Sequence, residues 1–310
     1  MGYVVAIGSS SLDHYYEAER WPALGDKAMV RSLGVKVGGL ISNAACVMAR
    51  CGLETYIIDI VSPDSEQLIL GELQEYGVHT EQIMRRSDYV QSMTNIYIVG
   101  GEKSIFICKK KPQLFLSGEQ YDLILGASAV YTTLPELRYI NNYNEIIKKM
   151  KANGGRLVFD METPVFSNTE EDRKLIAQAD ILFFNEMAMD KLCDGHKEED
   201  VVEQLIGKGV EIVVVTRAEK GCSVYSHYGY LDAPGLQVKA VDTTGAGDTF
   251  NSVFLAAVLE GFSLERCAEL ANAGGARAVT MIGPKSGAAD LHEIDAFLKM
   301  VKKQKGVDEK

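Results

Sequence analysis

The sequence has no apolar run long enough to cross a membrane and no surplus of basic charge. A membrane-spanning helix needs about 20 consecutive apolar residues, and no stretch of these 310 residues approaches that length. The formal net charge of −11 argues against nucleic acid or an anionic membrane as the main partner. The basic run Lys109–Lys111 is too short to reverse this balance. Residues 1–7 lack the basic lead-in and small-residue cleavage site of a signal peptide, so we expect none.

Cysteine is sparse, and its spacing shows no pairing pattern. The six cysteines include no C-x-x-C pair and lie scattered at positions 46, 51, 108, 193, 222 and 267. This spacing disfavours a disulfide framework, and we expect reduced, mostly buried thiols in a cytoplasmic protein. With 46% apolar and 24% charged residues, the composition is that of a soluble globular protein able to bury a sizeable core.

Strand-like runs alternate with helical periodicity along most of the chain. The strand-like runs are short and rich in β-branched and aromatic residues: 3–7, 55–60, 129–132, 157–160, 181–184 and 212–216. The helical stretches are 40–50, 66–76, 135–151, 173–178, 200–208, 248–260, 264–280 and 290–303. This alternation predicts an α/β fold, with a parallel sheet covered by helices on both faces.

Two segments break the alternation. Residues 26–37 and 89–108 read as extended, hairpin-like pieces with no helix between their strands, and Gly100-Gly101 is a turn signal in the second. They are alike in character although distant in sequence, so they could form one small sheet that stands off the main domain. An ordinary pair of surface hairpins is the alternative.

The stretch 242–250, Asp-Thr-Thr-Gly-Ala-Gly-Asp-Thr-Phe, carries the strongest chemical signal. It follows a β-type run, 236–241, and opens an apolar helical segment. Backbone amides around Gly245, Ala246 and Gly247 would form an anion site at the helix start. Asp248 would oppose a bound phosphate unless it takes a proton from a hydroxyl that receives the phosphoryl group. A glycine turn with Asp248 as an ordinary helix cap is the alternative.

The same stretch resembles the C-terminal signature of the PfkB/ribokinase family of carbohydrate kinases. A second similarity lies near the N-terminus, in Gly38-Gly39, in residues 43–45 and in residues 49–52, which match the family's glycine pair, Asn-x-Ala and closing glycine. The two signatures occur in the expected order in a chain of the expected length. The resemblance therefore covers nearly all of the sequence.

This resemblance implies one ribokinase-like domain over residues 1–310, a three-layer α/β sandwich with a mainly parallel central sheet. About 13–37 and 88–111 would form a small β-sheet lid over the sugar, which in many members clasps a second lid into a homodimer. The implied activity is ATP-dependent transfer of the γ-phosphoryl group to a hydroxyl of a neutral sugar or sugar-like polyol. Asp248 would be the general base, and Mg²⁺ would come with the nucleotide.

On the sugar side, the resemblance points to an aspartate, a glycine pair and an asparagine. Asp13 would stand at the carboxyl end of the first strand and accept hydrogen bonds from two sugar hydroxyls. Gly38 and Gly39 would let the backbone approach the ligand, and the Asn43 amide can donate and accept at once. From the residues alone, Asp13 as a turn residue and Asn43 as a solvated helix position stay open. Glu136 is a weaker candidate, because a Pro-Glu pair also starts helices.

On the nucleotide side, residues 216–221 resemble the family's Thr-x-Gly-x-x-Gly loop, from Thr216 to Gly221. Ala218 stands where the first glycine is usual, and alanine reaches a positive φ less readily. A plain β-turn is the alternative. Asn272 and Gly275 match the small-residue helix that lies along the adenine, although close helix packing would explain them equally.

The resemblance also bears on cations. Asp242 and Thr244 match positions that bind a monovalent cation such as K⁺ in many relatives, with backbone near Ala278 and Gly283 completing the site. Many members lack this dependence.

Three positions depart from the family pattern. Asn185, a further candidate on the nucleotide side, is present in the family's Asn-x-x-Glu motif, which organises magnesium and phosphate through water. Ala188 stands where that motif has its glutamate. Residues 160–164 only partly match an Asp-Pro-Asn-x-Arg pattern, and Met281 replaces a common arginine. We expect a kinase with a raised Mg²⁺ requirement, which an Ala188→Glu variant would lower.

Two other functions stay open. The first is a nucleoside kinase of the same family, with Tyr15, Tyr16 or Trp21 stacking on the base. The second is a non-catalytic sugar or nucleotide sensor, which Ala188 would favour. We expect the substrate to be uncharged near Asp13, because a second anion would be repelled there. Basic residues near the lid could instead hold a phosphate: Arg85, Arg86 and Lys109–Lys111.

Overall fold

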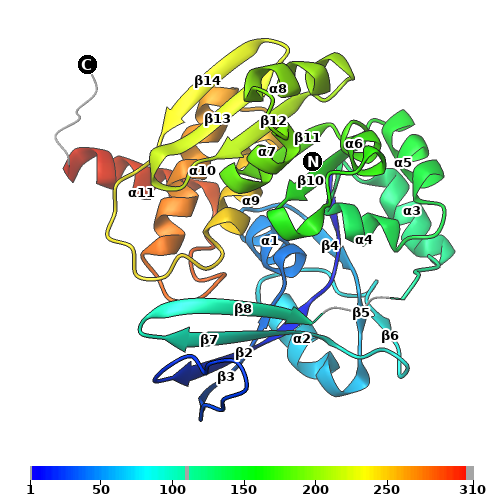
Figure 1. Cartoon of the computed structure of the whole chain (residues 1–310). Coiled ribbons are helices and arrows are strands. Elements are labelled where there is room, and N and C mark those ends of the chain that lie inside the picture. The colour runs from blue at the N-terminus through cyan, green and yellow to red at the C-terminus, as the bar shows by residue number, and fades with distance from the viewer. Residues whose placement is uncertain (1, 109–111, 305–310) are drawn as a thin grey trace.

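The computed structural model describes residues 2–108 and 112–304, and its largest element is an eight-stranded sheet (Figure 1). In spatial order the strands are β14 (Gly229–Pro234), β13 (Gly221–Ser226), β12 (Ile212–Thr216), β11 (Ile181–Asn185), β10 (Arg156–Met161), β9 (Ala129–Thr132), β1 (Val4–Ile7) and β4 (Thr55–Ile58). The strands from β12 to β4 pair in parallel, and β13 and β14 add an antiparallel edge. The expected mainly parallel sheet is confirmed.

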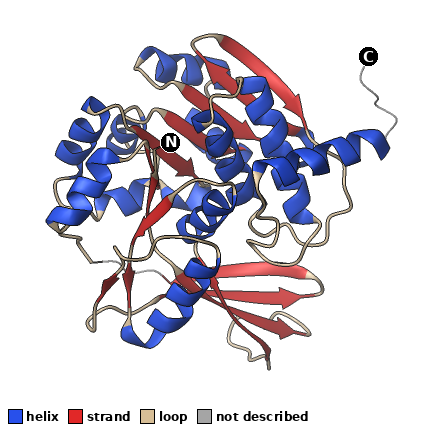
Figure 2. Ribbon diagram, turned by 180° about the vertical axis from the view of Figure 1, so that it is seen from behind, coloured by secondary structure: helices blue, strands red, loops and turns tan. Residues whose placement is uncertain are grey.

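Helices cover both faces of this sheet, which gives three layers (Figures 1 and 2). One face carries α1 (Leu40–Arg50), α2 (Pro63–Glu75), α9 (Ala246–Leu259), α10 (Leu264–Val279) and α11 (Leu291–Gln304). The other carries α3 (Gly118–Gly126), α4 (Leu134–Arg138), α5 (Tyr143–Ala152), α6 (Glu170–Ile176), α7 (Glu186–Cys193) and α8 (Glu198–Gly207).

Because helices cover both faces of the sheet, its central strands are apolar along most of their length. Successive strand side chains point to opposite faces. In β12, Ile212 and Val214 therefore lie in one buried cluster, while Val213 and Val215 lie in the other. A strand buried on both faces has no polar alternation, which is why the short runs in the sequence are apolar throughout.

The two extended segments do pair into one separate sheet, below the sandwich in Figure 1. Its order is β3 (Arg31–Gly38), β2 (Ser11–Ala18), β7 (Ser92–Val99) and β8 (Glu102–Cys108). β2 pairs with β7 in parallel, which joins the two distant segments. Gly100 and Gly101 form the β7–β8 turn with φ values of 61° and 88°, as the turn signal predicted. We call this sheet the lid. A further short pair is β5 (Ile60–Val61) with β6 (Met84–Arg85).

The structure corrects several local predictions. The helix expected over 135–151 is two helices, α4 and α5, because Asn142 before α5 adopts a left-handed conformation with φ 58°. Residues 236–241 form no strand and link β14 to α9 as an irregular connection. Asp13 lies inside lid strand β2 and not in a loop after β1. Helices α3 and α7 and the β13–β14 hairpin were missed.

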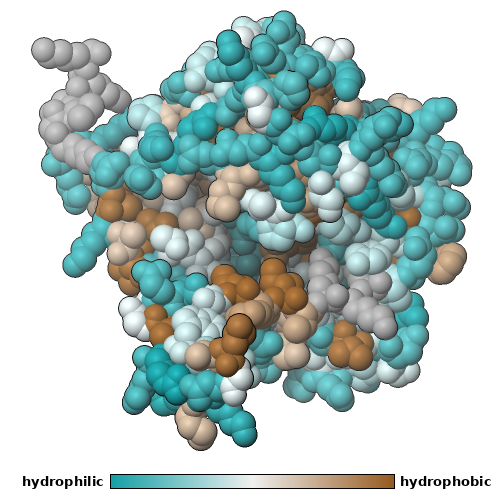
Figure 3. Space-filling model, viewed as in Figure 1, coloured by the Kyte–Doolittle hydropathy of each residue, from teal (hydrophilic) through white to brown (hydrophobic). Residues whose placement is uncertain are grey.

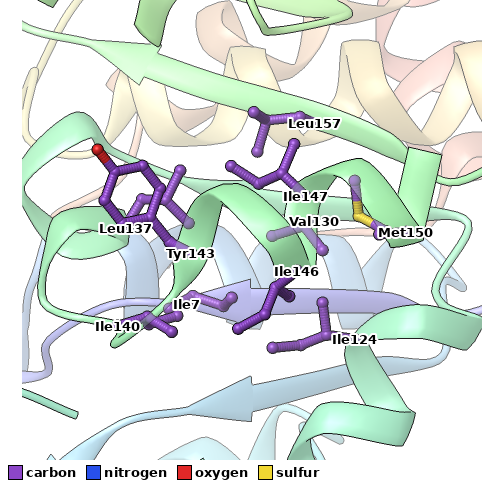
Figure 4. A pocket seen from close by; sticks show the side chains of 10 residues that line it. All are labelled: Ile7, Ile124, Val130, Leu137, Ile140, Tyr143, Ile146, Ile147, Met150 and Leu157. Atoms are coloured by element: carbon purple, nitrogen blue, oxygen red, sulfur yellow. The ribbon is translucent and has the colours of Figure 1, made fainter. Parts of the chain in front are cut away.

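The core is closely packed around one small apolar gap between α5 and the sheet (Figure 4). Its volume is about 10 Å³, at the lower limit for one water molecule. Its lining is apolar, with side chains such as Ile147 and Leu157, so we read it as a packing gap and not as a ligand site. Within residues 2–108 and 112–304, no helix is long and apolar enough to span a membrane.

Candidate active site

The turn into helix α9 is formed by the glycine-rich stretch 242–250 and requires glycine at one position. Gly245 precedes the helix with φ 75°. A Cβ on it would lie 1.9 Å from the carbonyl oxygen of Pro284, so a larger residue would force the two segments apart. The loop that follows α10 therefore packs directly against this turn.

The backbone amides at the start of α9 are the expected anion donors. First-turn amides have no carbonyl four residues back, and this applies to Ala246, Gly247 and Asp248. The amide of Ala246 donates weakly to the carbonyl of Thr243 at 3.3 Å. Gly247 and Asp248 are thus the better placed donors for a phosphoryl oxygen, with the positive end of the helix dipole behind them.

Asp248 lies beside these amides and meets a residue from the other signature. Its Oδ2 accepts a hydrogen bond from Nδ2 of Asn43 at 2.9 Å. Helices α1 and α9 pack together, which brings these two residues into contact although they are 205 positions apart. The Asn43 Oδ1 is buried and, among the described residues, has no hydrogen-bond partner, so it can accept a bond from a ligand hydroxyl.

The electrostatic surroundings make the carboxylate of Asp248 more basic than an exposed one. Burial raises the pKa of its carboxyl, and the nearby carboxylates of Asp160 and Glu162 raise it further. The Asn43 hydrogen bond and the charge of Lys285 oppose this rise without cancelling it. A carboxylate with a raised pKa accepts a proton more readily, which is the property a general base needs.

Asp13 is buried at the base of the lid, and the glycine pair makes room for it. Its Oδ1 accepts a hydrogen bond from Ser11 Oγ at 2.7 Å. A Cβ on Gly38 would lie 1.9 Å from Asp13 Oδ2, and one on Gly39, where φ is 108°, would lie 2.4 Å from the Ser9 carbonyl oxygen. The glycines therefore admit the Asp13 side chain and the neighbouring backbone, a reason different from the ligand approach that we expected.

Sequence reasoning missed a buried lysine, Lys285, whose charge acts on both Asp13 and Asp248. Lys285 is 4% exposed, pairs with Glu72 at 2.5 Å and donates to the carbonyl of Val37 at 2.8 Å. Its charge lowers the pKa of both Asp13 and Asp248, against the larger effect of burial. No motif marks it in the sequence, because its role depends on the loop after α10 reaching the base of the lid.

Asp248 also lines a pocket of about 550 Å³. It is lined by the carboxyl ends of β10 to β12, by the start of α9 and by one face of α10. All six residues predicted for the nucleotide line it, namely Asn185, Thr216, Ala218, Gly221, Asn272 and Gly275. Ala246, Gly247 and Asp248 line it too, so the anion site opens into this pocket.

Several pocket residues also have a structural role. Ala218 adopts a left-handed conformation with φ 50°, so alanine accepts here the strain that the usual glycine avoids. Asn272 donates to the carbonyls of Ala233 at 3.1 Å and Pro234 at 3.3 Å, which secures the end of β14. Asn185 caps α7 by accepting a hydrogen bond from the amide of Ala188 at 2.8 Å.

Ala188 does not face the pocket. It is fully buried in the hydrophobic cluster under α7, and the pocket is lined by its neighbours Glu186 and Met187. A glutamate at 188 would place its carboxylate among apolar side chains before it could reach a metal. The expectation that Ala188→Glu lowers the Mg²⁺ requirement therefore loses its structural basis.

Two other carboxylates are better placed to influence magnesium. Asp160 and Glu162 line the pocket, and burial raises the pKa of each. Asp160 Oδ2 accepts hydrogen bonds from the Tyr131 hydroxyl at 2.5 Å and from Asn251 Nδ2 at 3.0 Å. Carboxylate oxygens suit Mg²⁺. Among the residues described, no three acidic, histidine or cysteine side chains cluster as a metal site.

The predicted monovalent-cation residues meet a lysine from the lid. Lys103 Nζ lies 2.8 Å from Asp242 Oδ1 and 2.9 Å from Thr244 Oγ1. Asp242 Oδ2 also accepts a hydrogen bond from the amide of Gly283 at 3.0 Å. The structure thus brings Asp242, Thr244 and Gly283 together, and the Lys103 ammonium binds Asp242 and Thr244.

Comparison with known proteins identifies the family of this chain. The family model described as pfkB family carbohydrate kinase matches residues 1–290. A ribokinase of Arabidopsis thaliana is 27% identical, with 96% of this chain and 81% of the relative covered. A nucleoside kinase of Methanothermobacter thermautotrophicus is 24% identical, with 94% and 93% covered.

Solved structures show the same fold. The structure of Arabidopsis thaliana ribokinase complexed with ribose and ATP has a TM-score of 0.83 at 25% identity and covers 96% of this chain and 99% of its own. A putative ribokinase II from E. coli in complex with ATP and Mg²⁺ has a TM-score of 0.81 at 22% identity, with 97% and 100% covered. The chain therefore belongs to the pfkB family of carbohydrate kinases, which are ATP-dependent phosphotransferases with a ribokinase fold.

Proposed function

We propose that this protein transfers the γ-phosphoryl group of ATP to a hydroxyl of a neutral sugar or sugar-like polyol. The observation that carries the proposal is the contact between Asn43 Nδ2 and Asp248 Oδ2. This contact joins Asn43, in the N-terminal signature, to Asp248, at the start of α9. The proposed base therefore lies between a nucleotide site and an acceptor site. The nucleotide-sized pocket lies on one side, and the buried Asp13 at the lid base belongs to the other.

In the proposed reaction, Asp13 and Asn43 hold hydroxyl groups of the acceptor. Asp248 takes the proton of the attacking hydroxyl as the new oxygen–phosphorus bond forms. The amides of Gly247 and Asp248 stabilise the charge on the transferred phosphoryl oxygens. Mg²⁺, when bound with ATP, would neutralise phosphate charge near Asp160 and Glu162. The lid excludes water, which limits wasteful ATP hydrolysis.

The charges at the lid favour a neutral acceptor. Arg85 pairs with Glu66 at 3.0 Å and Arg86 with Asp88 at 2.6 Å, so both arginines are occupied at the surface. The run Lys109–Lys111 lies outside the described residues. Two described lysines lie near Asp13: Lys285, which is buried and paired with Glu72, and Lys36, the exposed cross-strand neighbour of Asp13. Efficient turnover of a sugar phosphate that is lost in Lys36→Met would overturn the preference for neutral sugars.

A nucleoside acceptor is the second candidate, and one aromatic residue supports it. Tyr15 shares a strand face with Asp13, and its ring packs near the Lys36 ammonium at 5.5 Å. Tyr16 points to the opposite face and stacks on Tyr97, with 5.2 Å between ring centres. Trp21 also contacts Tyr97. Of the three predicted aromatic residues, only Tyr15 is thus placed to stack on a base.

The deciding experiment is a substrate panel with purified protein, ATP and Mg²⁺. Pentoses, hexoses, polyols, nucleosides and sugar phosphates are each tested by direct chromatographic measurement of ADP, with ³¹P NMR of the product. Asp248→Asn serves as the control for contaminating kinases. Turnover of a neutral sugar supports the first proposal, and turnover of nucleosides alone replaces it with the second. Tight calorimetric binding without turnover of any acceptor would favour a sensor.

We further propose that the lid pairs with the lid of a second copy. β8 is an edge strand, and Ile105, Phe106 and Ile107 on it are each more than half exposed. Figure 3 shows apolar atoms gathered over this part of the lid. A groove of about 490 Å³ on the lid is lined by aromatic residues that include Trp21 and Tyr97. An unpaired apolar edge invites a strand or sheet partner, and a symmetric dimer would cover it.

A further inference from the structure

Lys103 occupies the position where a monovalent cation was expected. It lies on β8 close to the hairpin turn, 139 residues before Asp242 in the chain. Its ammonium is within hydrogen-bond distance of both Asp242 Oδ1 and Thr244 Oγ1, at 2.8 and 2.9 Å. Two oxygen atoms that would coordinate a free ion are therefore already bound to a positive charge. The arrangement does not fit a resident potassium ion that uses these oxygens.

The carboxylate of Asp242 fastens the loop that leads into the anion site. Besides Lys103, its Oδ1 accepts hydrogen bonds from the Thr244 amide at 3.0 Å and the Thr244 hydroxyl at 2.7 Å. Its Oδ2 accepts one from the Gly283 amide at 3.0 Å. The Asp242 carboxylate therefore accepts four hydrogen bonds, three on Oδ1 and one on Oδ2.

A carboxylate at this place calls for a compensating cation. Asp242 lies only three residues before Gly245, where the anion-binding turn begins. An uncompensated carboxylate would repel the phosphate groups that this turn is built to receive. A positively charged group bound to the oxygens of Asp242 and Thr244 reduces this repulsion and holds the loop in place.

We propose that the Lys103 ammonium is the built-in monovalent cation of this kinase. It replaces K⁺ at Asp242 and Thr244, and it ties the lid to the loop that presents the amides of Gly247 and Asp248. Lys103 is a positioning residue, because it acts on the phosphoryl group through this loop. Phosphoryl transfer is consequently independent of added K⁺, and the cation arrives only when the lid is closed.

The kinetic test compares Lys103→Met with wild type in tetramethylammonium, K⁺ and NH₄⁺ chlorides at constant ionic strength. ADP is measured directly, because coupling enzymes can themselves need K⁺. Wild type should change by less than about twofold between these salts. Lys103→Met should lose about 10–100-fold in kcat in tetramethylammonium, as for other supporting groups at ion sites. K⁺ or NH₄⁺ should restore most of this loss.

Two further variants separate the charge from the fold. Lys103→Arg keeps the positive charge, so it should retain more activity than Lys103→Met without added K⁺. Glu102→Gln changes the charge of the neighbouring hairpin residue and should leave both kcat and the salt response unchanged. A kcat of Lys103→Met that equals wild type in every salt would overturn the proposal. So would a wild-type enzyme that needs K⁺.

An ion-binding measurement tests the same inference without any acceptor. The kinetic arm rests on the proposed kinase function, whereas ²⁰⁵Tl⁺ NMR and thermal unfolding in K⁺ use the protein alone. Lys103→Met should bind Tl⁺ and be stabilised by K⁺ relative to tetramethylammonium, and wild type should show neither effect. Binding of Tl⁺ to wild type with the same affinity would overturn the inference. A failed substrate panel would leave this result intact, so the two failures are distinguishable.

Discussion

The substitution Asp248→Asn isolates the chemical role of one carboxylate. The new amide keeps the shape of the side chain, and its oxygen can still accept the hydrogen bond that Asn43 Nδ2 donates at 2.9 Å. The contact between α1 and α9 should therefore survive. What disappears is the ability to take a proton from the acceptor hydroxyl.

The expected loss follows from that single change. A positioned general base contributes about 10²–10⁴-fold to the rate, equivalent to about 2.7–5.5 kcal/mol of activation free energy. We expect kcat to fall by this factor, while KM for ATP and for the acceptor changes by less than about threefold. Initial rates of ADP release at saturating ATP, with calorimetry for binding, measure both parts.

The thermal stability of Asp248→Asn should not fall with its kcat. Burial, Asp160 and Glu162 raise the pKa of Asp248 in the folded protein. A raised folded pKa means that the stability Asp248 contributes is fully present at low pH and is lost as pH rises through the folded pKa. The neutral amide removes this loss, so Asp248→Asn should unfold at the same or a higher temperature at neutral pH.

A matched control is Asp180→Asn. Asp180 is buried outside the pocket, where it accepts a hydrogen bond from the Leu157 amide at 2.7 Å and pairs with Lys151 at 2.8 Å. This variant should lose stability without losing kcat. The base assignment is refuted if Asp248→Asn keeps more than about a tenth of the wild-type kcat, or if it loses ATP binding and folding together.

Four further predictions follow from the same geometry. Because the base must be ionised and burial raises the pKa of Asp248, kcat/KM should rise with pH above the ordinary carboxyl range. Glu162→Gln should move this acid limb to lower pH, and an unchanged pH–rate profile would contradict the coupling. Ala218→Gly should raise the unfolding free energy by about 0.5–1 kcal/mol in urea, since glycine relieves the strain at φ 50°; a lower midpoint would count against it. Ala188→Glu should lower stability by more than about 2 kcal/mol, because the site is fully buried, and a stable variant that saturates at lower Mg²⁺ would restore the original expectation. Sedimentation should show a dimer at micromolar concentration that Phe106→Glu converts to a monomer, whereas a monomeric wild type would exclude lid pairing.

Much of the fold could be predicted because its signals are local. The strands at 129–132 and 212–216 and the helix at 40–50 match the structure residue for residue, since apolar runs and helical periodicity reflect burial on nearby faces. The break before α5 was missed because periodicity continues across it. The β-like run 236–241 was misread because its apolar residues meet no strand partner.

Some residues of the candidate site could likewise be predicted from local patterns, and others could not. The glycine turn, Asp248 and the pocket residues Thr216 and Gly221 follow strand ends or start helices, so their patterns are visible in the sequence. Lys285 and Lys103 carry no such pattern. Each reaches the site from a segment whose position depends on how the lid and the loop after α10 meet the sandwich.

The sequence by itself determined the class of fold, the anion loop and the candidate base, because each depends on residue types at short spacing. Only the tertiary structure decided which charges surround them. Lys103 meets Asp242 because the lid sheet lies against the loop that leads into α9, and Ala188 lies in the core because it is on the buried side of α7. Such contacts join residues far apart in the chain, and no local periodicity can encode the distance between two segments that meet only after folding.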